Sequence, residues 1–264
     1  MGGAGWRTRL REFRVRVRGA LRPRRTVCSR GLRFTLPADN WITYYRWQSF
    51  STKEPATLDW IDAHMSDGET LFDIGANIGL YTIYAALRHP GARIVAFEPE
   101  YANLHLLRDN IMENGIQDRV QIYSVALSRQ SGLSALYIQD ATPGAALHTE
   151  SREPLRFTRS QRPVIWREGV YTLTLDEFCE ATGLQPQCLK IDVDGTEAEI
   201  LEGATDTLRS SLIRSLILEM PCEQVARKQC EALLRSAGWQ SQLIGAHDSH
   251  ANTVWVRSTN DRGT

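Results

Sequence analysis

The stretch LFDIGANIGLYT, residues 71–82, runs from an apolar segment containing one aspartate, Asp73, into two glycines, Gly75 and Gly79. Such a run followed by helical spacing is typical of a buried strand that turns into a helix. Glycine permits the turn and lets a ligand approach the backbone closely. The pattern is neither GxGxxG nor GxxxxGK[ST], so it does not indicate a pyrophosphate cradle. Asp73 favours a ligand with an ammonium or sulfonium group; a tight turn without a ligand is the alternative.

Strands and helices alternate on both sides of this stretch. We predict helices at 57–65, 80–88, 101–114, 176–182, 197–209 and 223–237, and strands at 32–36, 70–74, 93–97, 120–125, 133–138, 170–175, 188–193, 213–220, 239–244 and 253–257. This alternation predicts an α/β fold built from right-handed βαβ units on a parallel sheet. Residues 128–174 interrupt the rhythm, and we predict an insertion or lid there.

The second predicted strand delivers an acid, Glu98, about 20 residues after the glycine loop, where nucleoside-binding sheets hold a ribose diol. The alternative is that Glu98 only complements the dipole of the following helix, a task that Glu100 could equally perform. A glycine loop followed by such an acid, with no phosphate loop, indicates a nucleoside with a cationic tail. S-adenosylmethionine fits that description.

Five segments in order complete the pattern: FDIGANIGLYT (72–82), FEPE (97–100), VALS (125–128), LKIDVDGTEAEILEGA (189–204) and LILEM (216–220). Together they resemble the FkbM family of S-adenosylmethionine-dependent methyltransferases. The family usually has Glu where this chain has Asp194. The resemblance implies a Rossmann-like class I methyltransferase fold over residues 70–258, with a mostly parallel seven-stranded sheet and helices on both faces. A cap segment, 31–69, precedes this domain, and a tail, 259–264, follows it.

The resemblance also implies a set of cofactor-binding residues. Around the methionine portion of the cofactor it places Asp73, Gly75, Ala76, Asn77 and Gly79; at the ribose Glu98 and Pro99; and beside the adenine Ser124, Ala126 and Leu127. Tyr81 is a further candidate, with simple packing as its alternative role. Asp192 completes the set.

The chemistry is expected at LKIDVDGTE, where the period of a strand puts Lys190, Asp192 and Asp194 on one side. Three charges within five residues are hard to explain as buried core. We predict Asp192 as the base or the anchor of the methyl acceptor, and Lys190 as its partner in a structural or catalytic role. His250, in a polar cluster with His247 and Asp248, is a second candidate base.

Other acids in this region are weaker candidates. Glu197 begins the next predicted helix and can simply complement its dipole, while Glu219 ends the following strand at the same rim. Asp192, Asp194 and Glu219 have the oxygens that Mg²⁺ prefers, but their spacing is not diagnostic, and we expect no metal.

Charge is distributed unevenly along the chain. Residues 1–30 hold ten arginines and one acid, so the rest of this formally neutral chain is acidic and a poor general nucleic-acid binder. We predict a basic arm at 1–30, either loosely packed or able to touch anionic lipid or a partner. Its apolar residues fit a helical face and an edge strand equally well. The five cysteines form no CxxC pair, and we expect reduced thiols in a cytoplasmic protein.

The resemblance to the FkbM family implies a methyltransferase that acts on oxygen, on a sugar or natural-product hydroxyl, with a small-molecule or glycan acceptor. N-methylation of a protein or small amine, and a non-catalytic S-adenosylmethionine-binding module, are the alternatives. The oligomeric state does not follow from the sequence.

Overall fold

The computed structural model describes residues 23–242 and 252–257. Its centre is a seven-stranded sheet in the order β12-β13-β11-β10-β3-β4-β5. The strands are β3 (Thr70–Ile74), β4 (Arg93–Phe97), β5 (Val120–Tyr123), β10 (Cys188–Ile191), β11 (Ser215–Glu219), β12 (Trp239–Gln242) and β13 (Asn252–Arg257). β13 pairs antiparallel with both of its neighbours, and the other pairs are parallel. The predicted seven-stranded, mostly parallel sheet is therefore confirmed.

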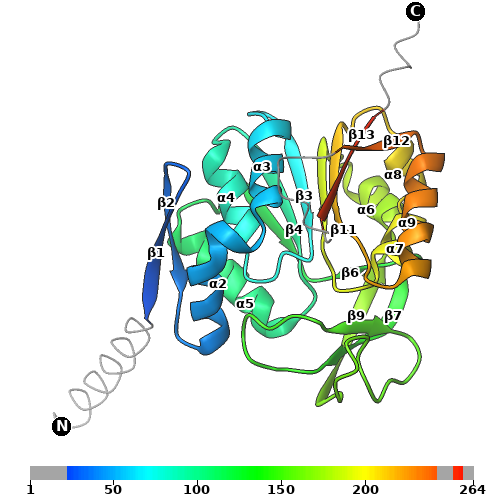
Figure 1. The fold of residues 1–264 in the computed structure, drawn as a ribbon, viewed down its shortest axis with the longest axis horizontal. Coiled ribbons are helices and arrows are strands. Elements are labelled where there is room, and N and C mark those ends of the chain that lie inside the picture. Colours follow the sequence, from blue (N-terminus) through cyan, green and yellow to red (C-terminus); the bar gives the residue numbers. More distant parts are fainter. Residues whose placement is uncertain (1–22, 243–251, 258–264) are drawn as a thin grey trace, which may run out of the picture.

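Helices cover both faces of this sheet (Figure 1). One side carries α2 (Trp41–Lys53), α3 (Pro55–His64), α4 (Leu80–Arg88) and α5 (Tyr101–Glu113); the other carries α6 (Leu175–Thr182), α7 (Glu197–Glu202), α8 (Thr205–Arg209) and α9 (Gln224–Ser236). Alternate strand residues enter the two cores, as the period of a strand requires: Leu71 and Ile94 pack in one, Phe72 and Val95 in the other.

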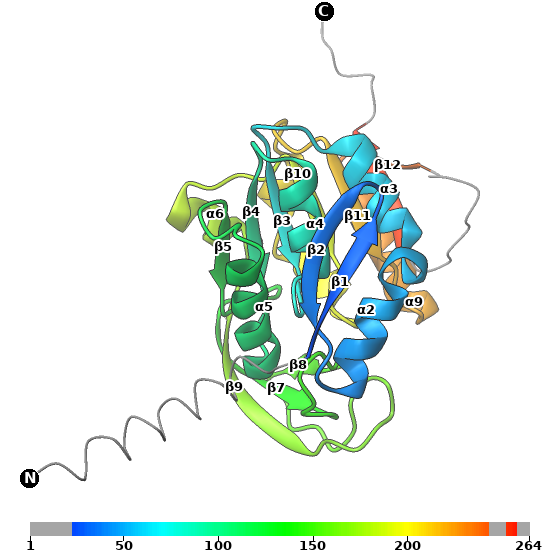
Figure 2. The ribbon, with the colours of Figure 1, turned by 90° about the vertical axis from the view of Figure 1, so that its left-hand side faces the viewer.

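A hairpin of β1 (Arg24–Ser29) and β2 (Leu32–Pro37) packs beside α2, α4 and α5 (Figure 2). Its Val27 and Phe34 are buried in the core, and Asn114 exchanges hydrogen bonds with the backbone of Thr35 at 2.8 and 2.9 Å. β1 lies inside the segment 1–30 expected as an arm, so part of that segment belongs to the folded domain.

Residues 128–174 form most of a second sheet in the order β6-β9-β7-β8. Its strands are β6 (Ala126–Leu127), β7 (Gly132–Ile138), β8 (Thr149–Ser151) and β9 (Trp166–Leu173).

Two other features differ from expectation: α2 was not predicted, and the helix predicted at 197–209 is two helices. The break falls at Gly203, where a Cβ would lie 2.2 Å from the carbonyl oxygen of Ser128. The two segments of the chain pass each other too closely there for any side chain.

Candidate active site

A cavity lies at the carboxyl ends of β3, β4 and β10, where the strand order reverses, the usual ligand position in an open α/β sheet. It encloses about 980 Å³ of empty space, including its open mouth. Its floor is formed by the ends of the three strands. Its cover is formed by α2, with Glu54 just after it, and by residues 143–148, which we call the strap.

The glycine loop forms the centre of the floor. Gly75 has a φ of +77°, and a Cβ on it would lie 1.9 Å from the carbonyl oxygen of Asp192, so only glycine fits there. Ala76 and Asn77 line the cavity. Gly79, with a φ of +86°, packs against Leu107 and does not line it. Gly75 therefore lets the segments after β3 and β10 approach each other closely, and the role of this loop in binding a ligand stays a prediction.

Asp73 faces away from the cavity. It pairs across the sheet with Lys190, whose Nζ lies 3.0 Å from Asp73 Oδ1 and 3.4 Å from Asp192 Oδ2. The hydroxyl of Thr82 donates to Asp73 Oδ2 at 2.6 Å. Burial alone would lower the pKa of Lys190, but the two carboxylates outweigh it and raise that pKa. Asp73 thus holds Lys190 in place, and its charge is already balanced within the protein.

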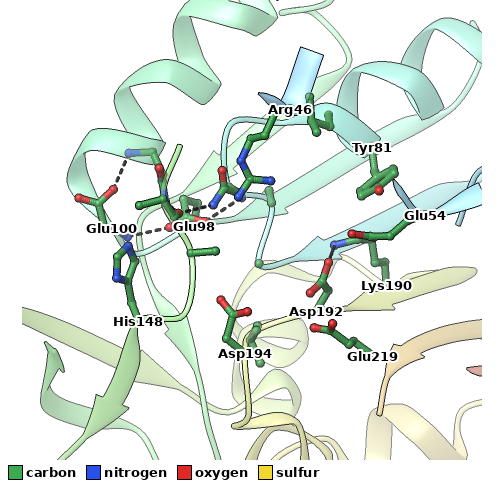
Figure 3. Close-up of a pocket in the computed structure, with 18 of the residues that line it drawn as sticks. Arg46, Glu54, Tyr81, Glu98, Glu100, His148, Lys190, Asp192, Asp194 and Glu219 are labelled. Atoms are coloured by element: carbon green, nitrogen blue, oxygen red, sulfur yellow. Dashed lines mark hydrogen bonds and ion pairs between the residues drawn. The ribbon is translucent and has the colours of Figure 1, made fainter. Parts of the chain in front are cut away.

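Asp192 is the carboxylate that reaches the cavity, with 25% of its side chain exposed. Its burial is outweighed by Lys190 and by a hydrogen bond with Glu219, so its pKa lies below the ordinary value. Burial and the charge of Asp192 raise the pKa of Glu219 to about 10. Figure 3 shows the Glu219 side chain beside Asp192. A carboxyl group with this raised pKa is protonated at neutral pH and can donate its hydrogen to an ionised Asp192.

Glu98 lies at the opposite end of the cavity. Its oxygens accept from the backbone N–H groups of Asn77 at 2.7 Å and Glu100 at 2.9 Å, while burial raises its pKa to about 7. Glu100 is the N-cap of α5, accepting from Ala102 and Asn103. The helix-capping alternative thus belongs to Glu100, and Glu98 is free to accept hydroxyl groups on its remaining lone pairs.

A smaller pocket adjoins the cavity and shares Pro99 with it. Pro99, Ala126 and Leu127 give this pocket the apolar side expected for an adenine. Ser124 does not join them: it lines a separate groove on the outside, between α5 and β5. Tyr81 lines the main cavity from α4, buried to 9% exposure. Its hydroxyl bonds to Glu54, and Lys190 Nζ lies 5.4 Å from its ring centroid.

The cover contains cavity-lining residues that were not predicted from the sequence. Arg46, Ser49, Phe50 and Lys53 of α2 face the cavity at helical spacing. Arg46 Nε donates to the carbonyl oxygen of Gly144 in the strap at 2.7 Å. The spacing of these four residues, after the N-cap Asn40, was the available signal.

Asp194 joins the cover to the floor. Its backbone has a φ of +62°, and its Oδ2 accepts from the N–H of Leu147 in the strap at 2.6 Å. Burial and the neighbouring Asp192 raise the pKa of Asp194 to about 6.

Glu197 is buried at the start of α7 and accepts from Gly195 N at 2.9 Å, outside the cavity lining. His247, Asp248 and His250 lie outside the described residues.

The cavity fits S-adenosylmethionine: Gly75, Ala76 and Asn77 line its floor, Glu98 can hold the ribose, and the adjoining pocket is lined mainly by apolar side chains. Fold and site together define a class I, Rossmann-like, S-adenosylmethionine-dependent methyltransferase. Within residues 23–242 and 252–257, no three His, Cys, Asp or Glu side chains group as a metal site, and no helix is long and apolar enough to cross a membrane.

Comparison with known proteins agrees. The methyltransferase FkbM domain matches residues 73–229, and the chain belongs to this family. It is 29% identical to 31-O-demethyl-FK506 methyltransferase FkbM of Streptomyces tacrolimicus, over 65% of this chain and 73% of that protein. It is 26% identical to methyltransferase sdnD of Sordaria araneosa, over 67% and 76%. The fold resembles Aeropyrum pernix fibrillarin, a structure with S-adenosyl-L-methionine bound, with a TM-score of 0.50, 10% identity and coverage of 88% and 80%.

Proposed function

We propose that this enzyme methylates a hydroxyl oxygen of a small molecule, a sugar or a natural product. The main support for this proposal is Asp192, an ionised and partly exposed carboxylate beside Gly75. It lies at the end of the cavity away from Glu98. One relative's name supports this choice, since 31-O-demethyl-FK506 is named for a missing O-methyl group.

S-adenosylmethionine supplies an electrophilic methyl group. Asp192 would accept the hydrogen bond of the attacking hydroxyl and so aim its lone pair. As the new carbon–oxygen bond forms, the methyl carbon–sulfur bond would break and leave a neutral thioether, so the oxygen becomes positively charged and its proton strongly acidic. A carboxylate with a lowered pKa is then still basic enough to take that proton. Lys190 and Glu219 keep Asp192 ionised and oriented until that moment.

The alternative of N-methylation is less well supported by the charges around Asp192. Asp194 and Glu54 line the same cavity. Nearby carboxylates stabilise the protonated form of an amine, which has no lone pair for attack. A hydroxyl does not carry this handicap. A non-catalytic binding module would have no need for the Lys190–Asp192–Glu219 arrangement.

We infer that no metal takes part, because the amine of Lys190 already bridges the carboxylates of Asp73 and Asp192. We expect the partner to be a small-molecule or glycan acceptor and not a nucleic acid, and any contact with a membrane surface to involve the arginine-rich N-terminal residues. All five cysteines are free, which favours the cytoplasm as the location.

The test combines cofactor and acceptor. Calorimetry should show S-adenosylhomocysteine binding, with NAD and ATP far weaker. Incubation with methyl-labelled S-adenosylmethionine and a panel of hydroxyl and amine compounds, read by mass spectrometry, should give labelled ethers. With an acceptor in hand, Asp192→Asn should lower kcat by about 10²–10⁴-fold while cofactor affinity stays constant. Labelling of amines alone, or an Asp192→Asn enzyme with normal kcat, would refute the proposal; strong inhibition by EDTA would refute its metal-free form.

A further inference from the structure

The strap is held over the cavity by hydrogen bonds to four separate parts of the protein. Its carbonyl oxygens and N–H groups bond to Asn40 (3.0 Å), Arg46 (2.7 Å), Asn77 (2.8 Å), Asn103 (2.8 and 3.0 Å) and Asp194 (2.6 Å). These contacts come from α2, the glycine loop, α5 and the loop after β10. The strap is therefore a fixed wall of the cavity.

His148 is the last residue of the strap and is held from both sides. Leu147 before it bonds to Asp194, and Thr149 after it is buried at the start of β8. The imidazole lines both the main cavity and the smaller apolar pocket. In Figure 3 its ring points towards Glu98 and Glu100. His148 thus stands where the ribose end of the cavity passes into the adenine end.

The imidazole has an unmet hydrogen-bonding requirement. Its Nδ1 is buried and, among the residues described, has no hydrogen-bond partner. Burial lowers the pKa of His148 to about 4, so at neutral pH the ring is uncharged, with one nitrogen donating and the other accepting. A buried polar atom without a hydrogen-bond partner is costly, and a ligand that bonds to it would remove that cost.

The residues around His148 in the smaller pocket indicate the chemical character of such a ligand. Pro99, Ala126 and Leu127 offer packing but no side-chain hydrogen bonds. The charged residue of the same pocket, Glu150, already accepts from the hydroxyls of Ser128 and Ser134. Thr196 adds a hydroxyl to this pocket, and His148 contributes a nitrogen that lacks a partner, beside a space suited to a flat heterocycle with polar edges.

We propose that His148 hydrogen-bonds the adenosine portion of the cofactor and is a specificity residue that the strap contributes to this site. The inference rests on S-adenosylmethionine as the methyl donor, but it is independent of the methyl acceptor. It gives the inserted segment a direct part in cofactor recognition, in addition to covering the cavity.

Calorimetry with two probes tests this. His148→Leu keeps an apolar body and should weaken S-adenosylhomocysteine binding by about three- to tenfold, the effect of one neutral hydrogen bond. 5′-Methylthioadenosine, which lacks the amino-acid tail, should lose the same factor. His148→Asn, whose amide can stand in for Nδ1, should recover affinity to within about twofold of wild type. His105→Leu, on the outer side of α5, is the matched control and should change neither value.

Unliganded melting temperatures of all variants serve as the check on folding. Wild-type affinity in His148→Leu for both probes would overturn the proposal, and so would an Asn variant as weak as the Leu variant. A wild-type protein that binds neither probe would instead overturn the cofactor assignment, which separates the two failures. A loss confined to S-adenosylhomocysteine would place His148 against the tail and also refute the proposal.

Discussion

The floor of the cavity and its cover differ in how the chain builds them. The floor comes from the ends of neighbouring parallel strands, where Gly75, Glu98 and Asp192 each follow a buried run. The cover joins α2 to the strap, and its contact between Arg46 and Gly144 spans 98 positions of sequence. The floor can therefore be read as short motifs, whereas the cover exists only through tertiary contacts.

This difference has an energetic counterpart. The floor includes the ion pair of Lys190 and Asp73, whose side chains are almost fully buried. Removing either partner would leave an unpaired charge buried in the sheet. The cover is attached mainly by hydrogen bonds to backbone atoms of the strap, each worth about 0.5–1.5 kcal/mol net. Floor variants should lose folding and binding together, and cover variants should change binding while the fold persists.

The largest effect is expected at Gly75. Gly75→Ala forces a Cβ to within 1.9 Å of the Asp192 carbonyl oxygen at a φ of +77°, so the floor must move. We expect a loss of about 2–5 kcal/mol in unfolding free energy, from strain and overpacking, and no measurable S-adenosylhomocysteine binding.

Gly115→Ala is the matched control for this substitution. Its φ is +66°, but nothing lies within 4 Å of the added Cβ, so only the left-handed strain of about 1–2 kcal/mol applies. Urea titration and calorimetry on both variants give the comparison. If the two variants were equally stable, the close approach of β3 and β10 would not be the constraint we describe.

The floor was predictable from sequence because its signals are local. The βαβ rhythm, the acid at 98 and the charged run at 190–194 each follow from strand period and turn chemistry within a few residues. Gly79 and Ser124 were expected beside the cofactor but do not line the cavity, and Asp73, expected there too, instead faces Lys190. The face of a strand residue follows from its neighbours across the sheet, and the sequence alone does not supply that register.

The cover could not be predicted in this way, because its parts meet only through tertiary contacts and carry no local signal as clear as the motifs of the floor. α2 has aromatic and polar residues around its whole circumference, with Trp41 exposed and Phe50 buried, so no single apolar stripe marks it. β1 contains three exposed residues before Val27 and so looked like part of a basic arm. His148 carries no motif at all, and only the folding of the strap brings it to the cavity.

A second, intermediate effect concerns Glu98 and pH. Its pKa of about 7 lies above the ordinary 4.5, so its contribution to stability is fully present below about pH 4.5 and is lost as the pH rises through about 7. Ribose hydroxyls donate best to the ionised form, so binding should behave oppositely. We expect S-adenosylhomocysteine affinity to rise by up to about tenfold between pH 6 and 8.

Glu98→Gln isolates this group from Asp194, whose pKa of about 6 also lies in the window. The variant cannot ionise at position 98, so its affinity should be about tenfold weaker at pH 8 and should lose most of its pH dependence. Calorimetry across the pH range measures both. An unchanged pH profile in Glu98→Gln would assign the titration to another carboxylate and would move the ribose away from Glu98.

The smallest effect is expected where the cover meets its helix. Asn40 caps α2 through Oδ1, which accepts from Ile42 and Thr43, and its Nδ2 donates to the Pro143 carbonyl oxygen of the strap at 3.0 Å. Asn40→Asp keeps the cap but replaces the donor to the strap with an oxygen. Stability should therefore change by less than about 1 kcal/mol, whereas Asn40→Ala should lose about 1 kcal/mol from the missing cap.

Because the strap would be held less firmly, stopped-flow dissociation of S-adenosylhomocysteine should be about two- to fivefold faster in Asn40→Asp, the factor expected for one lost hydrogen bond. Dissociation at the wild-type rate would mean that Arg46, Asn77, Asn103 and Asp194 hold the strap without help from Asn40, and that the cover is as firmly built as the floor.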